Sequence, residues 1–325
     1  MARLLLAPVL LAGIAWAAAA LWFDGPTSRG LAGALAGAFA LANLAILVAV
    51  RPTRRAALAI VACVAAVAFW WLRIPPRNDR DWLPDVARTA RTSFDGSRVT
   101  VENVRNFAYR SETDYDERWE TRTFDLDHVI GANLFLSFWG PTLIAHTIAT
   151  FEFDDAPPLA ISIETRKEKG ETYSAVLGFF RHYELYYVVA DERDVIGVRA
   201  DWRGEHVRLY RVKMPAAEAR ALLVDYLQEV DRLAAKPQWY NAFSHNCTTA
   251  IRQHRRRLGT AQAFDWRILA NGRLDELMYE RGAIDTTLPL DELRVRSDVT
   301  ERARAAGDAP DFSRRIREGV PGFGP

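Results

Sequence analysis

The stretch that decides the fold of this chain is "WYNAFSHNCTTAIRQH", residues 239–254. Asn246 is a favoured N-cap residue, and a helical pattern follows it to about Arg257. Cys247 therefore lies in the first turn of the predicted helix, where backbone N–H groups and the positive end of the helix dipole stabilise a thiolate. A thiol at such a position ionises below its usual pKa of roughly 8.5. The stretch predicts a nucleophilic cysteine at a helix N-terminus.

The chain has only two cysteines, and the other one, Cys63, lies within a strongly apolar segment. We expect Cys63 to pack as a small apolar residue and not to pair with Cys247 in a disulfide. Cys247 is then a lone thiol in the soluble part of the chain, which favours a chemical role for it. The structural alternative is that Cys247 merely packs at the start of a helix.

Three uncharged apolar segments precede the soluble part, at residues 4–23, 30–50 and 56–72. Each is close to the ~20 residues that a membrane-spanning helix needs. Trp70 and Trp71 end the third segment, where aromatic side chains favour the membrane interface. The segments predict three transmembrane helices.

Arginines around these segments predict the orientation. The loop between the second and third segments contains Arg51, Arg54 and Arg55, whereas the preceding loop has Arg29 offset by Asp24. The positive-inside rule places the arginine-rich loop in the cytoplasm, and the large domain on the other side. We expect a multi-pass protein of the bacterial inner membrane with a periplasmic domain. Alternatively, residues 1–20 are a cleaved signal peptide, which leaves the large domain on the same side.

The soluble part changes from strand-like to helical patterns. Four runs are typical of strands, because they alternate apolar and polar residues or are rich in β-branched and aromatic residues. They are residues 99–109, 159–166, 184–190 and 206–212. An apolar face from Leu222 to Leu233 then predicts a helix between Pro215 and Pro237. Strands followed by helices predict an α+β domain. We expect three parts: a transmembrane region at residues 1–76, a catalytic domain at 77–285 and a charged C-terminal tail at 286–325.

The composition argues against several classes of function. The chain has 42 Lys and Arg against 41 Asp and Glu, so there is no electrostatic case for nucleic acid as a partner. The sequence contains no Cys/His cluster with zinc spacing, no Gly-rich phosphate loop, and neither a G-x-S-x-G nor an HExxH motif. We therefore expect neither a metal nor a cofactor.

A thiolate nucleophile needs a base, and histidine is the usual one. His146 lies in the apolar run "PTLIAHTIATFEF", where burying an imidazole costs free energy. A core histidine with satisfied hydrogen bonds would explain the run equally well, but in combination with Cys247 we favour His146 as the base. The remaining histidines are His128, His182, His206, His245 and His254.

A third polar group usually orients the base. The candidates are Glu164 in "AISIETR" and Glu152 in "FEF", with a salt bridge to Arg166 as the structural alternative for Glu164. The "DERD" run at 191–194 with Arg199 is interpreted as an ion network at a strand end. We expect the catalytic residues to be Cys247, His146 and Glu164. We expect the substrate and oxyanion environment to be formed by Asn246, Thr248, Thr249, Tyr240 and Arg166.

Four stretches resemble a known family: "LIAHTIATFEF", "LAISIETRKEKGETYS", "YELYYVVADERDVIGVRA" and "PQWYNAFSHNCTT". They are similar to a bacterial membrane-protein family linked to Lnb-type lipoprotein N-acyltransferases, over roughly residues 78–285. The resemblance implies a circularly permuted papain-like fold, as in lecithin–retinol acyltransferases and NlpC-type hydrolases, in which His146 and Cys247 form the dyad. It also implies transfer of an acyl chain from phospholipid to the amino terminus of a lipoprotein, through a thioester on the cysteine. The three N-terminal spans depart from the family's characterised members.

The sequence thus predicts a membrane-anchored periplasmic cysteine acyltransferase. Its expected partners are membrane phospholipid and a lipoprotein or other amine acceptor. Two alternatives stay open: a cysteine amidase or peptidase that acts on cell-wall peptides, and a non-catalytic module of the cell envelope.

Overall fold

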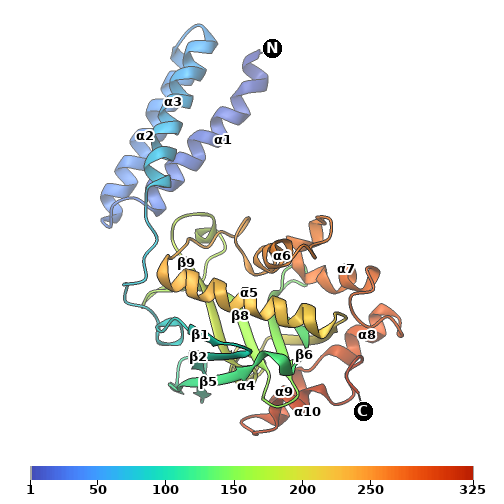
Figure 1. Ribbon diagram of the computed structural model, residues 1–325. Coiled ribbons are helices and arrows are strands. Elements are labelled where there is room, and N and C mark those ends of the chain that lie inside the picture. Colours follow the sequence, from blue (N-terminus) through green and yellow to red (C-terminus); the bar gives the residue numbers. More distant parts are fainter. Residues whose placement is uncertain (1, 325) are drawn as a thin grey trace. The chain divides into compact units, whose positions relative to one another are not determined.

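The computed structural model describes the backbone of residues 2–324 and the side chains of residues 6–324 (Figure 1). The chain divides into two compact units. The first consists of Met1–Arg77, Thr172–Glu184 and Trp239–Asn241. The second consists of Asn78–Glu171, Leu185–Gln238 and Ala242–Pro325.

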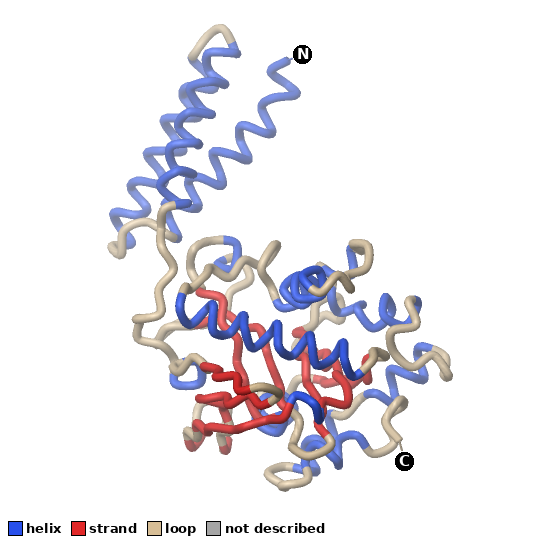
Figure 2. The backbone as a smooth tube through the Cα atoms, viewed as in Figure 1, coloured by secondary structure: helices blue, strands red, loops and turns tan. Residues whose placement is uncertain are grey.

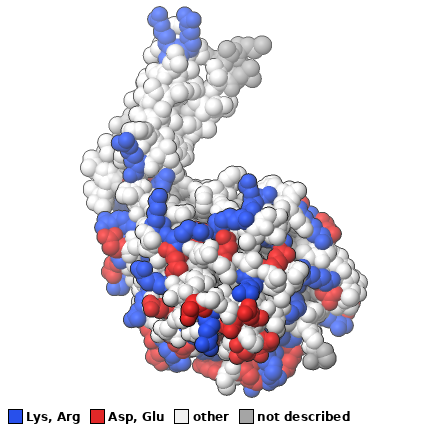
Figure 3. Space-filling view, viewed as in Figure 1, with Lys and Arg blue, Asp and Glu red and all other residues white. Residues whose placement is uncertain are grey.

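The first unit contains three long apolar helices: α1 (Ala2–Phe23), α2 (Arg29–Ala49) and α3 (Thr53–Leu72). All three are long and apolar enough to cross a membrane. Leu10 and Ile14 of α1 pack with Ile60 of α3, while most of the helix surface is exposed apolar side chains. Charged side chains on this helical region gather near its ends, as Figure 3 shows. The three helices correspond to the three predicted segments.

A loop from later in the sequence joins the ends of these helices within the first unit. Phe180 packs on Phe23 at the end of α1, with 4.9 Å between the ring centroids. The Arg181 guanidinium lies 4.5 Å from the centroid of the Trp71 ring, and its backbone N–H donates to Asp24 at 3.1 Å. The loop is therefore tied to α1 and α3 by aromatic, cation–π and hydrogen-bond contacts together.

The second unit is built on an eight-stranded sheet (Figure 2). Its strands are β1 (Arg91–Asp95), β2 (Arg98–Arg105), β5 (Trp119–Asp125), β6 (Val129–Phe138), β7 (His146–Phe153), β8 (Leu159–Arg166), β9 (Glu184–Asp191) and β10 (His206–Val212). The strand order is β1-β2-β9-β8-β7-β6-β10, and β5 pairs with β2. A separate two-stranded sheet joins β3 (Ala108–Tyr109) to β4 (Tyr115–Asp116).

Helices cover both faces of the sheet. Alternation along β6 sends Leu134 and Leu136 to one face and Phe135 to the other, and the two sets belong to separate apolar clusters. The two longest helices of this unit are α5 (Ala216–Ala235), which crosses the sheet in Figure 1, and α6 (Cys247–Arg257). The shorter ones are α4 (Glu192–Gly197), α7 (Leu274–Glu280), α8 (Leu290–Ser297), α9 (Thr300–Ala306) and α10 (Phe312–Arg317).

Short helical turns connect these elements. They are η1 (Pro84–Val86), η2 (Leu126–His128), η3 (Leu177–Phe179), η4 (Val198–Trp202), η5 (Trp266–Ile268) and η6 (Asn271–Arg273). All are 3₁₀ turns except η4, which is π-helical and continues directly from α4. Two of them, η4 and η6, supply side chains to the candidate site described below.

The predicted α+β class is confirmed, with three apolar helices followed by a mixed domain around a central sheet. The runs predicted at residues 159–166 and 206–212 are strands β8 and β10, and the predicted helix after Pro215 is α5. Residues 286–325, expected to be a charged tail, instead contribute α8, α9 and α10 to the second unit. Val299, Phe312 and Ile316 of this segment are buried in the cluster around Phe135.

A buried ion pair holds β2 to α4, and breaking it should destabilise the second unit. Arg105 donates to Asp194 at 2.7 Å, and Asp194 also accepts from the backbone N–H of Phe107 at 2.6 Å. In the Asp194→Ala chain the Arg105 charge stays buried without its partner, so we expect a loss of about 3–5 kcal/mol in the free energy of unfolding. Denaturant unfolding measures this loss, and the exposed pair of Arg110 and Asp114 provides the control. Asp114→Ala should change the midpoint little, and equal effects of the two substitutions would contradict the prediction.

Candidate active site

The N-terminus of α6 is fixed by a reciprocal capping box. Asn246 Oδ1 accepts from the N–H groups of Thr248 and Thr249 at 3.0 and 2.9 Å, and Thr249 Oγ1 accepts from the Asn246 N–H at 2.9 Å. The predicted N-cap is thus confirmed, and it places Cys247 in the first helical turn. The Cys247 side chain is buried, with 8 % of its residue surface exposed.

Strand register places three polar residues in one row across the sheet. Ser137 of β6 pairs with His146 of β7, and Ile148 of β7 pairs with Ser162 of β8. Continuing the second register by two residues brings Glu164 opposite His146. His146 Nε2 lies 3.1 Å from Glu164 Oε1 and 2.7 Å from Ser162 Oγ, which itself donates to Glu164 Oε1 at 2.7 Å. The carboxylate and the hydroxyl therefore orient the imidazole.

The Cys247 sulfur lies 3.8 Å from Thr248 Oγ1 and 3.7 Å from Asn271 Nδ2, and His146 acts on it electrostatically. Because Nε2 of His146 faces Glu164, the ring nitrogen left for the sulfur is Nδ1. Burial opposes ionisation of the thiol, but the neighbouring His146 outweighs it and lowers the pKa of Cys247 to about 6. Burial likewise opposes protonation of His146, but the Glu164 charge outweighs it and raises the pKa of His146 to about 9. Between these values the pair is a thiolate and an imidazolium.

A buried arginine keeps Glu164 ionised. Arg199 of η4 donates to Glu164 Oε1 at 2.7 Å and to Glu205 Oε2 at 3.1 Å, and Glu205 accepts from the Ser137 hydroxyl. Burial would raise the pKa of Glu164, but His146 and Arg199 hold that pKa well below its usual range. The two carboxylates compensate the guanidinium charge, so Arg199 can lie buried beside the imidazole.

Asn271 of η6 links the chain segments that contain Cys247 and His146. Its Nδ2 donates to Thr248 Oγ1 at 2.7 Å and lies 3.7 Å from the Cys247 sulfur, while its Oδ1 accepts from the N–H of Ala145 at 2.9 Å. The Asn246 side chain accepts from the N–H groups of Thr248 and Thr249. The Cys247 N–H, at the first helical position, has no intrahelical partner. This N–H and the Asn271 amide are therefore two donors beside the sulfur, suited to an oxyanion.

The structure brings the side chains of Cys247, His146 and Glu164 together, and their role as a catalytic triad stays a prediction. The residues expected to form the oxyanion environment have different roles. Asn246 and Thr249 form the helix cap, and the Thr248 hydroxyl accepts a hydrogen bond from Asn271. The remaining two residues have other contacts. The Arg166 guanidinium donates to the carbonyls of Val86 and Ala87, and the Tyr240 N–H donates to the Tyr183 carbonyl in the first unit.

Glu152, the other candidate carboxylate, lies at the far end of β7 from His146. It accepts from Arg211 and, at 2.7 Å, from Arg317. His254 is fully buried between Asp225 at 2.6 Å and the Tyr187 hydroxyl at 2.9 Å. His254 is thus a core histidine whose two ring nitrogens both have hydrogen-bond partners.

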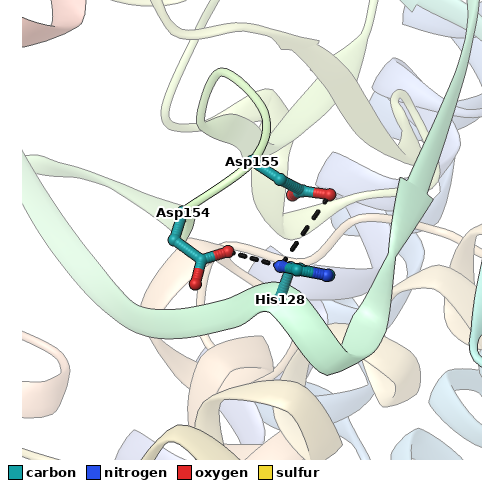
Figure 4. A group of neighbouring side chains, drawn as sticks. All are labelled: His128, Asp154 and Asp155. Carbon is teal, nitrogen blue, oxygen red and sulfur yellow. Dashed lines mark hydrogen bonds and ion pairs between the residues drawn. The ribbon is translucent and has the colours of Figure 1, made fainter.

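One group of side chains in the described part of the chain has the spacing for a metal ion: His128, Asp154 and Asp155 (Figure 4). His128 Nδ1 lies 2.6 Å from Asp154 and 4.0 Å from Asp155, and all three residues are exposed. The hydrogen bond with Asp154 raises the pKa of His128, so the protonated ring competes with any metal for the same carboxylate. We regard the group as a surface ion pair.

Sequence reasoning missed Arg199, Ser162 and Asn271 as members of the site. Ser162 had a usable signal, because it precedes Glu164 by two residues in a strand and so shares its face. Arg199 was interpreted as part of an ion network, and that network does exist, but it includes Glu164. Asn271 lies in a short turn between helices, where no periodic pattern marks it.

The ion pair makes a testable prediction about reactivity. In a Cys63→Ser chain, the rate of alkylation of Cys247 by iodoacetamide should rise with an apparent pKa of about 6, because the thiolate is the reactive form. In the His146→Ala chain the rise should move toward the ordinary thiol pKa of roughly 8.5. The pH dependence of alkylation, followed by mass spectrometry of the Cys247 peptide, measures both. The same titration in both chains would argue against an ion pair.

Residues 115–272 match the family model described as the Lnb N-terminal periplasmic domain. This range contains His146, Glu164, Cys247 and Asn271. Comparison with curated proteins and with solved structures gives no significant match.

Proposed function

Because residues 115–272 belong to the Lnb N-terminal periplasmic domain family and follow three apolar helices, this is a membrane-anchored periplasmic protein, and we propose that it is a cysteine acyltransferase. A single observation carries the proposal: a buried thiol at a helix N-terminus lies beside an imidazole that Glu164 orients and that lowers the pKa of the thiol. This is the arrangement of an activated nucleophile with its base and its orienting group.

The reaction has two steps. In the first, the Cys247 thiolate attacks the carbonyl carbon of an ester, a C–S bond forms, and the carbonyl electrons move onto oxygen. The Cys247 N–H and the Asn271 amide stabilise this oxyanion. When the oxyanion collapses, the C–O bond breaks and His146 gives its proton to the leaving alkoxide, which leaves a thioester on Cys247.

In the second step an amine attacks the thioester carbonyl. His146, now neutral, removes a proton from the amine, and the thiolate leaves as an amide forms. The products are an N-acylated acceptor and the original ion pair. The two pKa values suit both steps, because His146 is an acid when the alkoxide leaves and a base once it has lost its proton.

The proposed donor is a membrane phospholipid, and the proposed acceptor is the amine of a lipoprotein. We place the chain in the bacterial inner membrane as a multi-pass protein, anchored by α1, α2 and α3. Anchoring supports this choice because it keeps the large unit at the membrane, where ester-linked acyl chains are concentrated.

Trapping the acyl-enzyme tests the proposal. Full-length protein in nanodiscs is incubated with phospholipid labelled in its acyl chain. We expect a label on the peptide that contains Cys247, released by neutral hydroxylamine because thioesters are labile to it. Adding a peptide with a free amine should then move the label to that amine.

The other outcomes point to other functions. Cleavage of cell-wall peptides without any lipid adduct would indicate an amidase or peptidase, in which water resolves the acyl-enzyme. Neither a lipid adduct nor peptide cleavage would indicate a non-catalytic module. Either outcome would overturn the acyltransferase proposal.

A further inference from the structure

A cavity of about 270 Å³ lies in the second unit and begins beside the candidate site. Strands β6 and β7 and helices α5, α6 and α7 all contribute to its walls. Its apolar lining includes Leu134, Val212, Leu222, Ile251, Ile268 and Leu277. Thr248, the neighbour of Cys247, also lines it. The cavity therefore offers an apolar chamber next to the nucleophile.

One wall carries a buried hydroxyl without a partner. Tyr226 is fully buried, and its hydroxyl has no hydrogen-bond partner among the described residues. The ring is held in place by stacking on His254, with 3.7 Å between centroids, and His254 is itself bonded to Asp225. A buried hydroxyl without a partner costs free energy, which a ligand that accepts a hydrogen bond would recover. Tyr226 thus points to a ligand with an acceptor group, such as an ester carbonyl.

The cavity lining is also strongly basic. It includes Lys213, Arg252, Arg255 and Arg281, and none of the lining residues is an aspartate or a glutamate. Arg255 is paired with Glu218 at 3.2 Å.

The other two arginines lack such a partner. Arg252 and Arg281 donate to the carbonyls of Gln262 and Ala263. Within the described residues no carboxylate forms an ion pair with either of them, and the buried Nε of Arg252 has no partner at all. Asp265 is within electrostatic range of Arg281 without an ion pair between them, and both guanidinium groups remain suited to a phosphate.

The helix geometry relates the basic group to the nucleophile. Thr248, Arg252 and Arg255 follow one another at intervals of four and three residues, so they share one face of α6. Arg252 is about 6 Å along the helix axis from Thr248, from the rise of roughly 1.5 Å per residue. An ester group at Cys247 and a phosphate at Arg252 would therefore be a few bonds apart, as they are in a glycerophospholipid.

We propose that this cavity binds the acyl donor as a lipid that carries a phosphate. The acyl chain lies against the apolar walls, the ester carbonyl accepts from Tyr226 near Cys247, and the phosphate binds Arg252 and Arg281. The assignment of the bound lipid as the acyl donor rests on the proposed function, whereas the binding itself does not require turnover.

Photo-crosslinking tests the site. The full-length Cys247→Ala chain in nanodiscs is labelled with phosphatidylglycerol or with diacylglycerol, each with a diazirine in the acyl chain. We expect crosslinks on peptides that line the cavity, with about a tenfold preference for the phosphate-bearing lipid from one charged hydrogen-bonded group. Crosslinks confined to α1, α2 and α3 would overturn the proposal. Loss of the crosslinks on adding inorganic phosphate alone would also overturn it, because it would indicate a site for free phosphate.

Two matched pairs of variants make the test specific. Arg252→Gln with Arg281→Gln should erase the preference for the phosphate-bearing lipid, whereas Arg256→Gln, an exposed arginine on the same helix, should retain it. Met278→Trp fills the cavity and should reduce crosslinking at least about tenfold. Leu290→Trp, which is packed on the same apolar cluster but outside the cavity lining, should not. Equal crosslinking in the two tryptophan variants would overturn the site.

The two proposals can fail separately. Lipid that crosslinks in the cavity while the parent chain never forms a thioester would leave the binding site standing without the acyltransferase. A thioester on Cys247 that forms as fast in the Met278→Trp chain as in the parent would leave the acyltransferase standing without this site.

Discussion

The Cys247→Ser chain should transfer acyl groups at least about 10⁴-fold more slowly than the parent chain, as in other enzymes that lose their nucleophile. A thiol with a pKa of about 6 is ionised at neutral pH, whereas a serine hydroxyl in the same place stays protonated. The measurement is kcat/KM for transfer from labelled phospholipid to an amine peptide, in nanodiscs.

The chain offers a matched control in Cys63, which lies in α3 and has no part in the site. Cys63→Ser should retain the parent rate. Far-ultraviolet circular dichroism and the unfolding midpoint establish that both variants are folded. Retention of transfer activity by a folded Cys247→Ser chain would rule out a thioester mechanism.

Glu164→Gln should lower kcat/KM by about 10²–10⁴-fold, because an amide keeps the size of the side chain but loses the charge that orients the imidazole. The pKa of His146 is raised to about 9 largely by Glu164, so its removal should lower that pKa. Activity that needs the imidazolium is present below this pKa and lost above it. The alkaline limb of the pH–kcat/KM profile should therefore move from about pH 9 to lower pH.

Glu152→Gln provides the control, since Glu152 was the competing candidate and lies at the other end of β7. It leaves Arg211 and Arg317 with one carboxylate fewer, so it should reduce stability while the pH profile of kcat/KM stays in place. The assignment of Glu164 would be wrong if the two glutamines had equal effects on the rate, or if the alkaline limb of the Glu164→Gln chain did not move.

Local features of this fold were predictable because neighbouring residues determine them. Asn246 marks the start of α6 through its own side chain, and the period-two pattern at residues 159–166 marks β8 because one strand fixes its own alternation. The candidate residues Cys247, His146 and Glu164 could be singled out from the sequence, since each is a functional group in an unusual setting: a lone thiol, an imidazole in an apolar run and a carboxylate in a strand.

The rest of the site depends on contacts between distant segments. Arg199 reaches Glu164 from a π-helical turn, and Asn271 reaches Thr248 from a 3₁₀ turn. Neither turn has a periodic pattern, and the partners are 35 and 23 residues away in the chain. Strand register and helix placement decide such contacts, and a single sequence contains no local signal for them.

The segment at 286–325 was expected to be a tail because charged residues dominate it, although its few apolar residues are spaced for helices. Val299 and Ala303 are four residues apart, as are Phe312 and Ile316, and both pairs are buried. Two apolar pairs in short helices are a weaker sequence signal than one long apolar stripe, and the surrounding charges mask them.

The place of α9 and α10 has a consequence for how the protein is made. A chain threaded through the export machinery from its N-terminus delivers these helices after all the strands. Until they emerge, Phe135, Ile148 and Tyr186 of the sheet lack the cover that Val299, Phe312 and Ile316 provide. A translocation intermediate stalled before residue 299 therefore exposes an apolar surface to periplasmic chaperones and proteases. The second unit completes its folding only after translocation is complete.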